Sequence, residues 1–156
     1  QAALEVLGMP PEECYCTLLF YAAHADGRWL CGHIGDGYIF RIRQDTAVVF
    51  SAPENGHASN ETYFLSEPSA AQHLRIRSGE LHEPYAVLLT SDGGGDTLFD
   101  RQQQQPAHAV ERLCDWLTEN DEKTVTEALQ HVIKEKMIPA TEDDVSVAIL
   151  YCSEDE

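Results

Sequence analysis

The stretch YAVLLTSDGGGD, residues 85–96, decides the fold class of this chain. Its first six residues, Tyr85–Thr90, form a nearly continuous apolar run, which predicts a strand that is buried on both faces. Asp92 follows directly after this run, and Gly93 follows Asp92. A carboxylate at the end of a buried strand is held rigidly, and a neighbouring glycine lets backbone, water or substrate approach closely. Residues 85–96 therefore predict a central strand that ends in a candidate binding residue.

The sequence upstream of this strand is typical of an antiparallel meander. Four β-rich segments are separated by turn signals such as Asp26-Gly27, and they cover residues 15–24, 28–34, 38–43 and 47–50. Residues 51–71 carry the composition of a loop with at most one short helical turn. Residues 74–77 alternate like an edge strand that turns at Ser78-Gly79.

Two amphipathic helices and a last strand are predicted downstream. In the first helix Val110, Leu113, Cys114 and Leu117 keep helical spacing. The second begins at a capping box, Thr124–Glu127, and ends at Pro139, and residues 145–152 form the closing strand. Strands followed by helices and a closing strand indicate an α+β fold. We expect residues 1–156 to form a single domain.

Charge and composition exclude several classes of function. The net charge of −17 would repel a polyanion, so we expect no nucleic-acid partner. The longest apolar runs are far too short to cross a bilayer, so we expect no membrane partner. The five cysteines are odd in number and mostly lie in apolar stretches, which favours reduced thiols and a cytoplasmic location.

Three acidic turns stand at the ends of predicted strands. They are Gly35-Asp36-Gly37, Ser91-Asp92-Gly93 and Glu142-Asp143-Asp144. Carboxylates and water are the ligands that Mg²⁺ and Mn²⁺ prefer. One such turn is usually nothing more than a strand connection, but three in one chain make a divalent-cation site an equal alternative.

These segments resemble those of the metal-dependent protein phosphatases of the type 2C family. HIGDG, residues 33–37, resembles the family's strand that runs into Gly-Asp-Ser. AVLLTSDGGGD, residues 86–96, resembles its apolar strand followed by Ser-Asp-Gly-x-x-Asp, although Gly94-Gly95 replace bulkier residues and predict a mobile loop there. TEDDVSVAI, residues 141–149, resembles its closing Asp-Asn-x-Ser/Thr-Val strand. All three occur in the family's order.

The resemblance implies a fold, a metal centre and a reaction. The fold would be a β-sandwich of two antiparallel sheets flanked by helices, here N-terminally incomplete. Asp92 and Asp143 would be ligands of a binuclear Mg²⁺ or Mn²⁺ centre, and Asp36 would hold a third, weaker metal. Gly37, Gly93 and Asp144, which matches the family's Asn, would support them. A water activated by two metals would hydrolyse phosphoserine and phosphothreonine in proteins.

One departure from the family limits these implications. The family's first metal segment, Asp-Gly-x-Gly-Gly, is absent from these 156 residues. We therefore expect this polypeptide alone to be inactive and to act as part of a longer chain. The alternatives are a non-catalytic phosphatase-like binding or regulatory module and a cation-binding sandwich unrelated to phosphate. Expected partners are a phosphoprotein substrate and either the missing N-terminal segment or a second copy, which would pair with open sheet edges. The substrate protein and the physiological metal are not predicted.

Overall fold

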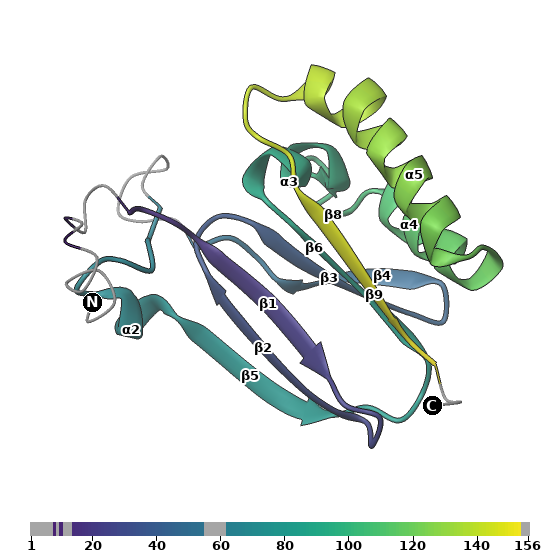
Figure 1. Ribbon diagram of the computed structural model, residues 1–156, viewed down its shortest axis with the longest axis horizontal. Helices are drawn as coiled ribbons and strands as arrows, with labels where there is room; N and C mark the ends of the chain where they lie inside the picture. The colour runs from purple at the N-terminus through teal and green to yellow at the C-terminus, as the bar shows by residue number, and fades with distance from the viewer. Residues whose placement is uncertain (1–7, 9, 11–13, 55–61, 154–156) are drawn as a thin grey trace. The chain divides into compact units, whose positions relative to one another are not determined.

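A computed structural model describes residues 8, 10, 14–54 and 62–153 (Figure 1). Its internal contacts divide the chain into two compact units. Unit 1 comprises residues 1–36 and 53–80, and unit 2 comprises residues 37–52 and 81–156. No helix in the described ranges is long and apolar enough to cross a membrane.

Unit 1 is built on a three-stranded antiparallel sheet. Its strand order is β1-β2-β5, with β1 at Leu18–Ala23, β2 at Arg28–Ile34 and β5 at Arg75–Glu80. A short helix, α2, spans Ala70–His73 just before β5. The predicted edge strand is confirmed, but the predicted turn at Ser78-Gly79 is wrong, because β5 continues through Gly79. A Cβ atom at Gly79 would lie 2.7 Å from the Trp29 ring, so this glycine makes room for an aromatic ring on the neighbouring strand.

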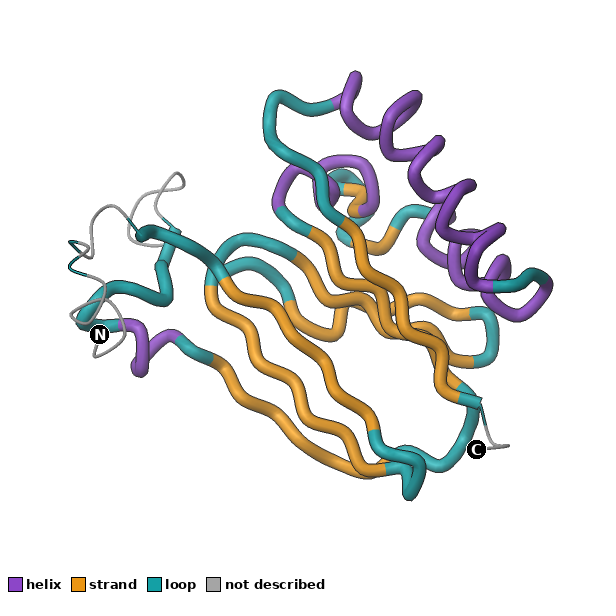
Figure 2. The backbone as a smooth tube through the Cα atoms, viewed as in Figure 1, coloured by secondary structure: helices purple, strands orange, loops and turns teal. Residues whose placement is uncertain are grey.

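Unit 2 contains a four-stranded antiparallel sheet, drawn in orange with the other strands in Figure 2. The strand order is β4-β3-β6-β9, with bounds Thr46–Ser51, Tyr38–Arg43, Tyr85–Thr90 and Val147–Cys152. Strand β6 lies between two partners, and five of its six residues are buried. The prediction of a central strand buried on both faces is confirmed.

The predicted meander of four consecutive strands is wrong. Strand β2 pairs with β1 and β5, whereas β3 pairs with β4 and β6, so β2 and β3 belong to different sheets. The break falls at Gly35, whose φ of +115° is a conformation that residues with side chains rarely adopt. Sequence order alone could not show this break, because the second partners of β2 and β3 are β5 and β6, which come later in the chain than all four strands.

Helices cover one face of the sheet of unit 2 (Figure 1). Helix α3 spans Asp92–Leu98, α4 spans His108–Glu119 and α5 spans Glu122–Val132, followed by a π-helix, η2, at Ile133–Met137 and a 3₁₀ turn, η3, at Ile138–Ala140. A small ladder of β7 (Phe99–Asp100) and β8 (Gln105–Pro106) links α3 to α4. Phe40 and Leu88 of the sheet pack in one core cluster with Leu98, Leu113 and Met137 of the helices. The predicted α+β class, with antiparallel sheets and flanking helices, is confirmed.

Helix α5 begins earlier than its capping box predicted. Asp121 is the N-cap, and its carboxylate accepts hydrogen bonds from the backbone N–H of Thr124 at 3.1 Å and from the Thr124 hydroxyl at 2.8 Å. An aspartate satisfies the first N–H groups of a helix as well as a threonine does and also interacts favourably with the helix dipole. Thr124 is therefore inside the helix rather than at its cap.

Candidate metal centre

The topology of unit 2 brings two of the three predicted ligands to the same end of one sheet. Strands β6 and β9 are antiparallel neighbours, with Thr90 opposite Val147. Asp92 comes just after the end of β6, as the first residue of α3. Asp143 lies in the loop of residues 141–146 just before β9, here called the Asp143 loop. The carboxyl end of one strand and the amino end of its antiparallel partner meet, so the two segments lie next to each other.

Four hydrogen bonds fasten these two segments together. The Ser91 hydroxyl donates to the carbonyl of Asp144 at 2.8 Å and accepts from the N–H of Ser146 at 3.0 Å. The N–H of Ser91 donates to the carbonyl of Ser146 at 3.1 Å, and the Thr90 hydroxyl donates to the same carbonyl at 2.9 Å. Because these bonds join residues within three positions of Asp92 and Asp143, the backbones that carry the two carboxylates have little freedom to separate.

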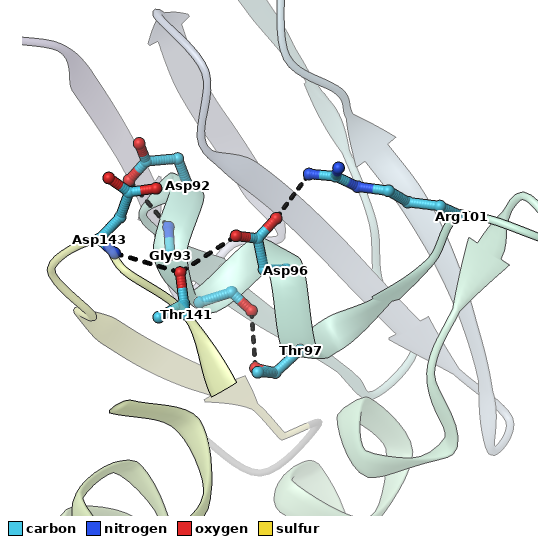
Figure 3. A network of polar contacts seen from close by, with 8 residues as sticks. Asp92, Gly93, Asp96, Thr97, Arg101, Thr141 and Asp143 are labelled. Atoms are coloured by element: carbon cyan, nitrogen blue, oxygen red, sulfur yellow. Dashed lines mark hydrogen bonds and ion pairs between the residues drawn. The ribbon is translucent and has the colours of Figure 1, made fainter. Parts of the chain in front are cut away.

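Gly93 sets how closely the segments approach. A Cβ atom at this position would lie 2.8 Å from the carbonyl oxygen of Asp144 and 2.9 Å from that of Asp143. The loop therefore rests directly on the backbone of α3, at a place that only glycine can occupy without a shift. Figure 3 shows the carboxylates of Asp92 and Asp143 beside each other above this contact.

Thr141 and Asp96 orient the Asp143 loop, and the sequence had assigned neither of them a role. The Thr141 hydroxyl donates to the Asp96 carboxylate at 3.1 Å and accepts from the N–H of Asp143 at 3.2 Å (Figure 3). Arg101 donates to the other oxygen of Asp96 at 2.5 Å, which offsets the charge of that carboxylate. The signal that could have found Thr141 is its position two residues before Asp143, where a threonine hydroxyl commonly bonds the backbone of a turn.

The glycine-rich segment after Asp92 is helical, and the predicted loop is wrong. A Cβ atom at Gly94 would lie 1.8 Å from the Thr90 hydroxyl oxygen, and one at Gly95 would lie 2.6 Å from the Tyr38 ring. All three glycines of α3 are buried. Glycine costs helix stability, but here it permits a helix that packs against strand, ring and loop at backbone distance.

The third predicted ligand belongs to the other unit. Asp36 is the last residue of the first part of unit 1, and its carboxylate accepts a hydrogen bond from the Thr62 hydroxyl at 2.5 Å. Gly37 is buried and precedes β3 in unit 2. The roles of Asp36 and Gly37 stay predictions. Among the residues that the structure describes, no three His, Cys, Asp or Glu side chains gather as a group that could hold a metal ion.

The donor set of Asp92 and Asp143 fits a hard divalent cation in part. Both side chains offer carboxylate oxygens, which Mg²⁺ and Mn²⁺ prefer over nitrogen and sulfur. Two neighbouring carboxylates repel each other, and a cation between them would remove that repulsion. Arg101 is engaged by Asp96, so it does not serve as that cation. Two carboxylates are fewer ligands than Mg²⁺ takes in its octahedral geometry, so water or other groups would have to complete the coordination.

His33 is a buried histidine of unit 1. It is 1% exposed on β2, and the Arg75 guanidinium donates to its Nδ1 at 2.9 Å. Burial, together with the nearby positive charge of Arg75, lowers the pKa of His33 to about 4. The ring is therefore neutral at pH 7, as its role as an acceptor from arginine requires.

Comparisons with solved structures agree with the fold described above. The chain resembles the phosphatase domain of SpoIIE from Bacillus subtilis, with a TM-score of 0.55 and 18% identity over 99% of this chain and 65% of that one. It resembles PppA of Pseudomonas aeruginosa with a TM-score of 0.58 and 17% identity over 95% of this chain and 61% of that one. The serine/threonine phosphatase PstP of Mycobacterium tuberculosis gives a TM-score of 0.56 and 14% identity over 88% and 59%.

These solved structures share the fold with this chain, which spans less than two thirds of the length of each. No curated protein sequence matches the chain. The family model described as Protein phosphatase 2C matches residues 1–134, a range that includes Asp36 and Asp92 and ends before Asp143. This match covers most of the chain, and the chain therefore belongs to the protein phosphatase 2C family.

Proposed function

We propose that this chain is the part of a metal-dependent phosphatase that contributes Asp92 and Asp143 to a Mg²⁺ or Mn²⁺ centre, and that the complete enzyme hydrolyses phosphoserine and phosphothreonine in proteins. One observation carries the proposal. The backbones beside the two aspartates are joined by the Ser91 hydrogen bonds and by the close contact at Gly93. A module with no need for a cation has no evident reason to hold two carboxylates together in this way.

Bound divalent cations would supply an activated water and would offset charge on the phosphoryl oxygens. The neighbouring residues of this chain would keep the metal ligands Asp92 and Asp143 in place. Asp92 is fixed by its place at the start of α3, where its Oδ1 accepts from the N–H of Gly93 at 2.8 Å. The backbone N–H of Asp143 donates a hydrogen bond to the Thr141 hydroxyl, which fixes the backbone that carries this ligand. Metal ligands that are held before the metal binds lose less freedom on binding, which raises affinity.

Binding of Mn²⁺ tests this proposal without any need for turnover. Free Mn²⁺ is measured by electron paramagnetic resonance during titration of the chain and of the variants Asp92→Asn and Asp143→Asn. We expect saturable binding that weakens about tenfold or more in each variant, because affinity depends on the number of charged ligands. Asp115→Asn is the matched control, since Asp115 is an exposed carboxylate on α4 of the same unit. Equal loss in all three variants would show that the acidic surface, rather than a site, attracts the ion.

Hydrolysis of an aryl phosphate in the presence of Mn²⁺ tests the reaction itself. We expect this polypeptide alone to show little turnover and the longer protein to show turnover that EDTA abolishes. Asp92→Ala in the longer protein is expected to remove activity. Turnover that EDTA leaves unchanged would end the metal-centred mechanism.

A non-catalytic binding or regulatory module is the second candidate. It is favoured by the finding that, in the part of the chain that the structure describes, no three acidic, histidine or cysteine side chains form a group that could hold a metal ion. This candidate predicts no metal-stimulated hydrolysis by the longer protein, and the aryl phosphate assay therefore separates the two.

We also propose that an open sheet edge pairs with another segment of the full-length protein or with a second copy. Strand β9 is an edge strand of its sheet, and its Leu150 and Tyr151 are exposed. Edge strands expose backbone groups that readily pair with another strand. We further propose a reducing compartment such as the cytoplasm, in which the five free thiols would stay reduced.

A further inference from the structure

The helical layer of unit 2 contains an apolar pocket that the proposed reaction does not use. It has a volume of about 290 Å³ and lies between α3, α4 and the segment formed by α5 and η2. Buried Leu98, Leu113 and Met137 line it, together with the half-buried ring of Trp116. Its volume is close to the lower limit of the roughly 300–1,000 Å³ that small-molecule sites occupy. The pocket is therefore large enough for a small ligand with an apolar body.

Two cations flank this apolar lining. Arg112 of α4 and Lys136 of η2 both line the pocket and both are exposed. Neither forms an ion pair within the described part of the chain, although the whole protein carries 27 acidic residues against 10 basic ones. The chain is strongly acidic, yet Arg112 and Lys136 lie beside the same apolar pocket without an ion-pair partner among the described residues. Their positive charges complement a ligand that carries a negative charge.

The wall that carries Lys136 has an unusual backbone. Residues Ile133–Met137 form a π-helix, a rare conformation that often marks functional sites. Lys136 and the buried Met137 are its last two residues, so this single turn supplies both a charge and an apolar surface to the pocket. The same combination occurs on α4, where exposed Arg112 adjoins buried Leu113.

We propose that this pocket binds a small amphipathic carboxylate, with its hydrocarbon body against Leu98, Leu113 and Met137 and its carboxylate between Arg112 and Lys136. The volume suits about ten non-hydrogen atoms at the ~30 Å³ that one water molecule occupies in the liquid. Octanoate has this size, and it serves as the probe. The site is separate from the candidate metal centre, and its test does not depend on phosphatase activity.

Fluorescence of Trp116 reports on binding, because Trp29 is the chain's other tryptophan and Trp29→Phe removes its signal. Octanoate is titrated into this variant, and calorimetry on the unmodified chain repeats the measurement. We expect saturation at one molecule per chain with half-saturation at or below about 1 mM, within the range for a ligand of this size. Octanamide, which is neutral and has the same number of non-hydrogen atoms, is expected to bind about three- to tenfold more weakly.

Variants locate the site. Arg112→Gln and Lys136→Gln are each expected to weaken octanoate binding about three- to tenfold and to leave octanamide binding unchanged. Lys134→Gln is the matched control, because Lys134 lies on the same π-helix and does not line the pocket. Ala109→Phe places a ring at the exposed edge of the pocket and should block both ligands while the melting temperature stays unchanged. The proposal is overturned if octanamide binds as tightly as octanoate, if Ala109→Phe binds normally, or if binding does not saturate at about tenfold higher concentration.

Discussion

Replacement of Gly93 by alanine tests whether the contact between α3 and the Asp143 loop has the closeness that the structure shows. Gly93 is the second residue of α3, and its φ lies outside the left-handed range, so its backbone already suits alanine. On propensity alone, Gly93→Ala would stabilise the folded chain by about 0.5–1 kcal/mol. The direction of the measured change therefore separates helix propensity from packing.

Packing predicts the opposite direction. The new methyl group would lie 2.8 Å from the Asp144 carbonyl oxygen, 2.9 Å from the Asp143 carbonyl oxygen and 3.1 Å from the Asp143 carbonyl carbon. All three are backbone atoms, so no rotamer change can relieve the overlap and the loop itself must move. Overpacking of this kind costs about 1–3 kcal/mol. After the gain in propensity, we expect a net loss of about 1 kcal/mol in the free energy of unfolding, the difference between the middle values of the two ranges.

Urea unfolding of the wild type and of Gly93→Ala measures this difference, and Mn²⁺ titration shows whether displacement of the loop also weakens the candidate site. Gly94→Ala is the matched comparison. Its methyl group would lie 1.8 Å from the Thr90 Oγ1, a side-chain atom that Thr90→Ala removes. In a double-mutant cycle, Thr90→Ala should therefore offset part of the cost of Gly94→Ala and none of the cost of Gly93→Ala. A Gly93→Ala chain that equals or exceeds the wild type in stability would refute the close contact.

The buried His33, the Thr141 hydroxyl and the buried Cys114 thiol can each be tested by a single measurement. The folded-state pKa of His33 is about 4, below its value of about 6.5 in an unfolded chain, so the unfolded state takes up the proton first as the pH falls. The contribution of neutral His33 to the free energy of unfolding is therefore fully present above about pH 7 and should fall by about 3 kcal/mol between pH 6.5 and 4. His33→Gln should remove this fall when the free energy of unfolding is measured by urea at each pH, and a fall that persists in the variant would contradict the assignment. Thr141→Val removes the acceptor of the Asp143 N–H and should lower the free energy of unfolding by about 0.5–1.5 kcal/mol, whereas Thr141→Ser should retain most of it. Burial raises the pKa of Cys114 to about 12, so its reactive thiolate form is scarce at pH 8. A thiol reagent at pH 8 should modify exposed Cys16 first and should modify Cys114 only at the rate of unfolding. Equal rates of modification for the two residues would show that Cys114 is accessible in the folded chain.

The strands were the most predictable part of the fold. The bounds 28–34 and 38–43 were predicted from their residue pattern and the turn residues around them, and 85–90 from a nearly continuous apolar run. The structure has the same bounds. The pairing was not predictable in the same way. Strand β2 pairs with β5 across more than forty residues of sequence, and β6 pairs with β9 across a helical layer. Local periodicity shows that a segment is a strand, whereas its partners depend on the packing of the whole chain.

The proximity of Asp92 and Asp143 was expected from resemblance to the family, and the structure shows how this chain achieves it. The motifs placed both residues at strand ends, but the alignment of those ends depends on the register of β6 against β9, with Thr90 opposite Val147. A shift of that register would move Asp143 away from α3. The hydrogen bonds of Ser91 to both sides of the loop oppose such a shift. The Ser91 hydrogen bonds therefore stabilise the register of β6 against β9 at the end of the sheet where Asp92 and Asp143 lie.

The three glycines after Asp92 show why helix α3 could not be predicted from the sequence. Glycine disfavours helices, so a run of three predicts a loop, and local propensity is the only information that a single segment offers. In the folded chain each glycine faces a different neighbour at backbone distance: the Asp143 loop, the Thr90 hydroxyl and the Tyr38 ring. A larger residue at any of the three would force one of these neighbours outward. At Gly93 the loss of helix propensity is thus tied to the close approach of the Asp143 loop to α3, which places the two carboxylates side by side. Gly94 and Gly95 let the same helix pack against Thr90 and Tyr38.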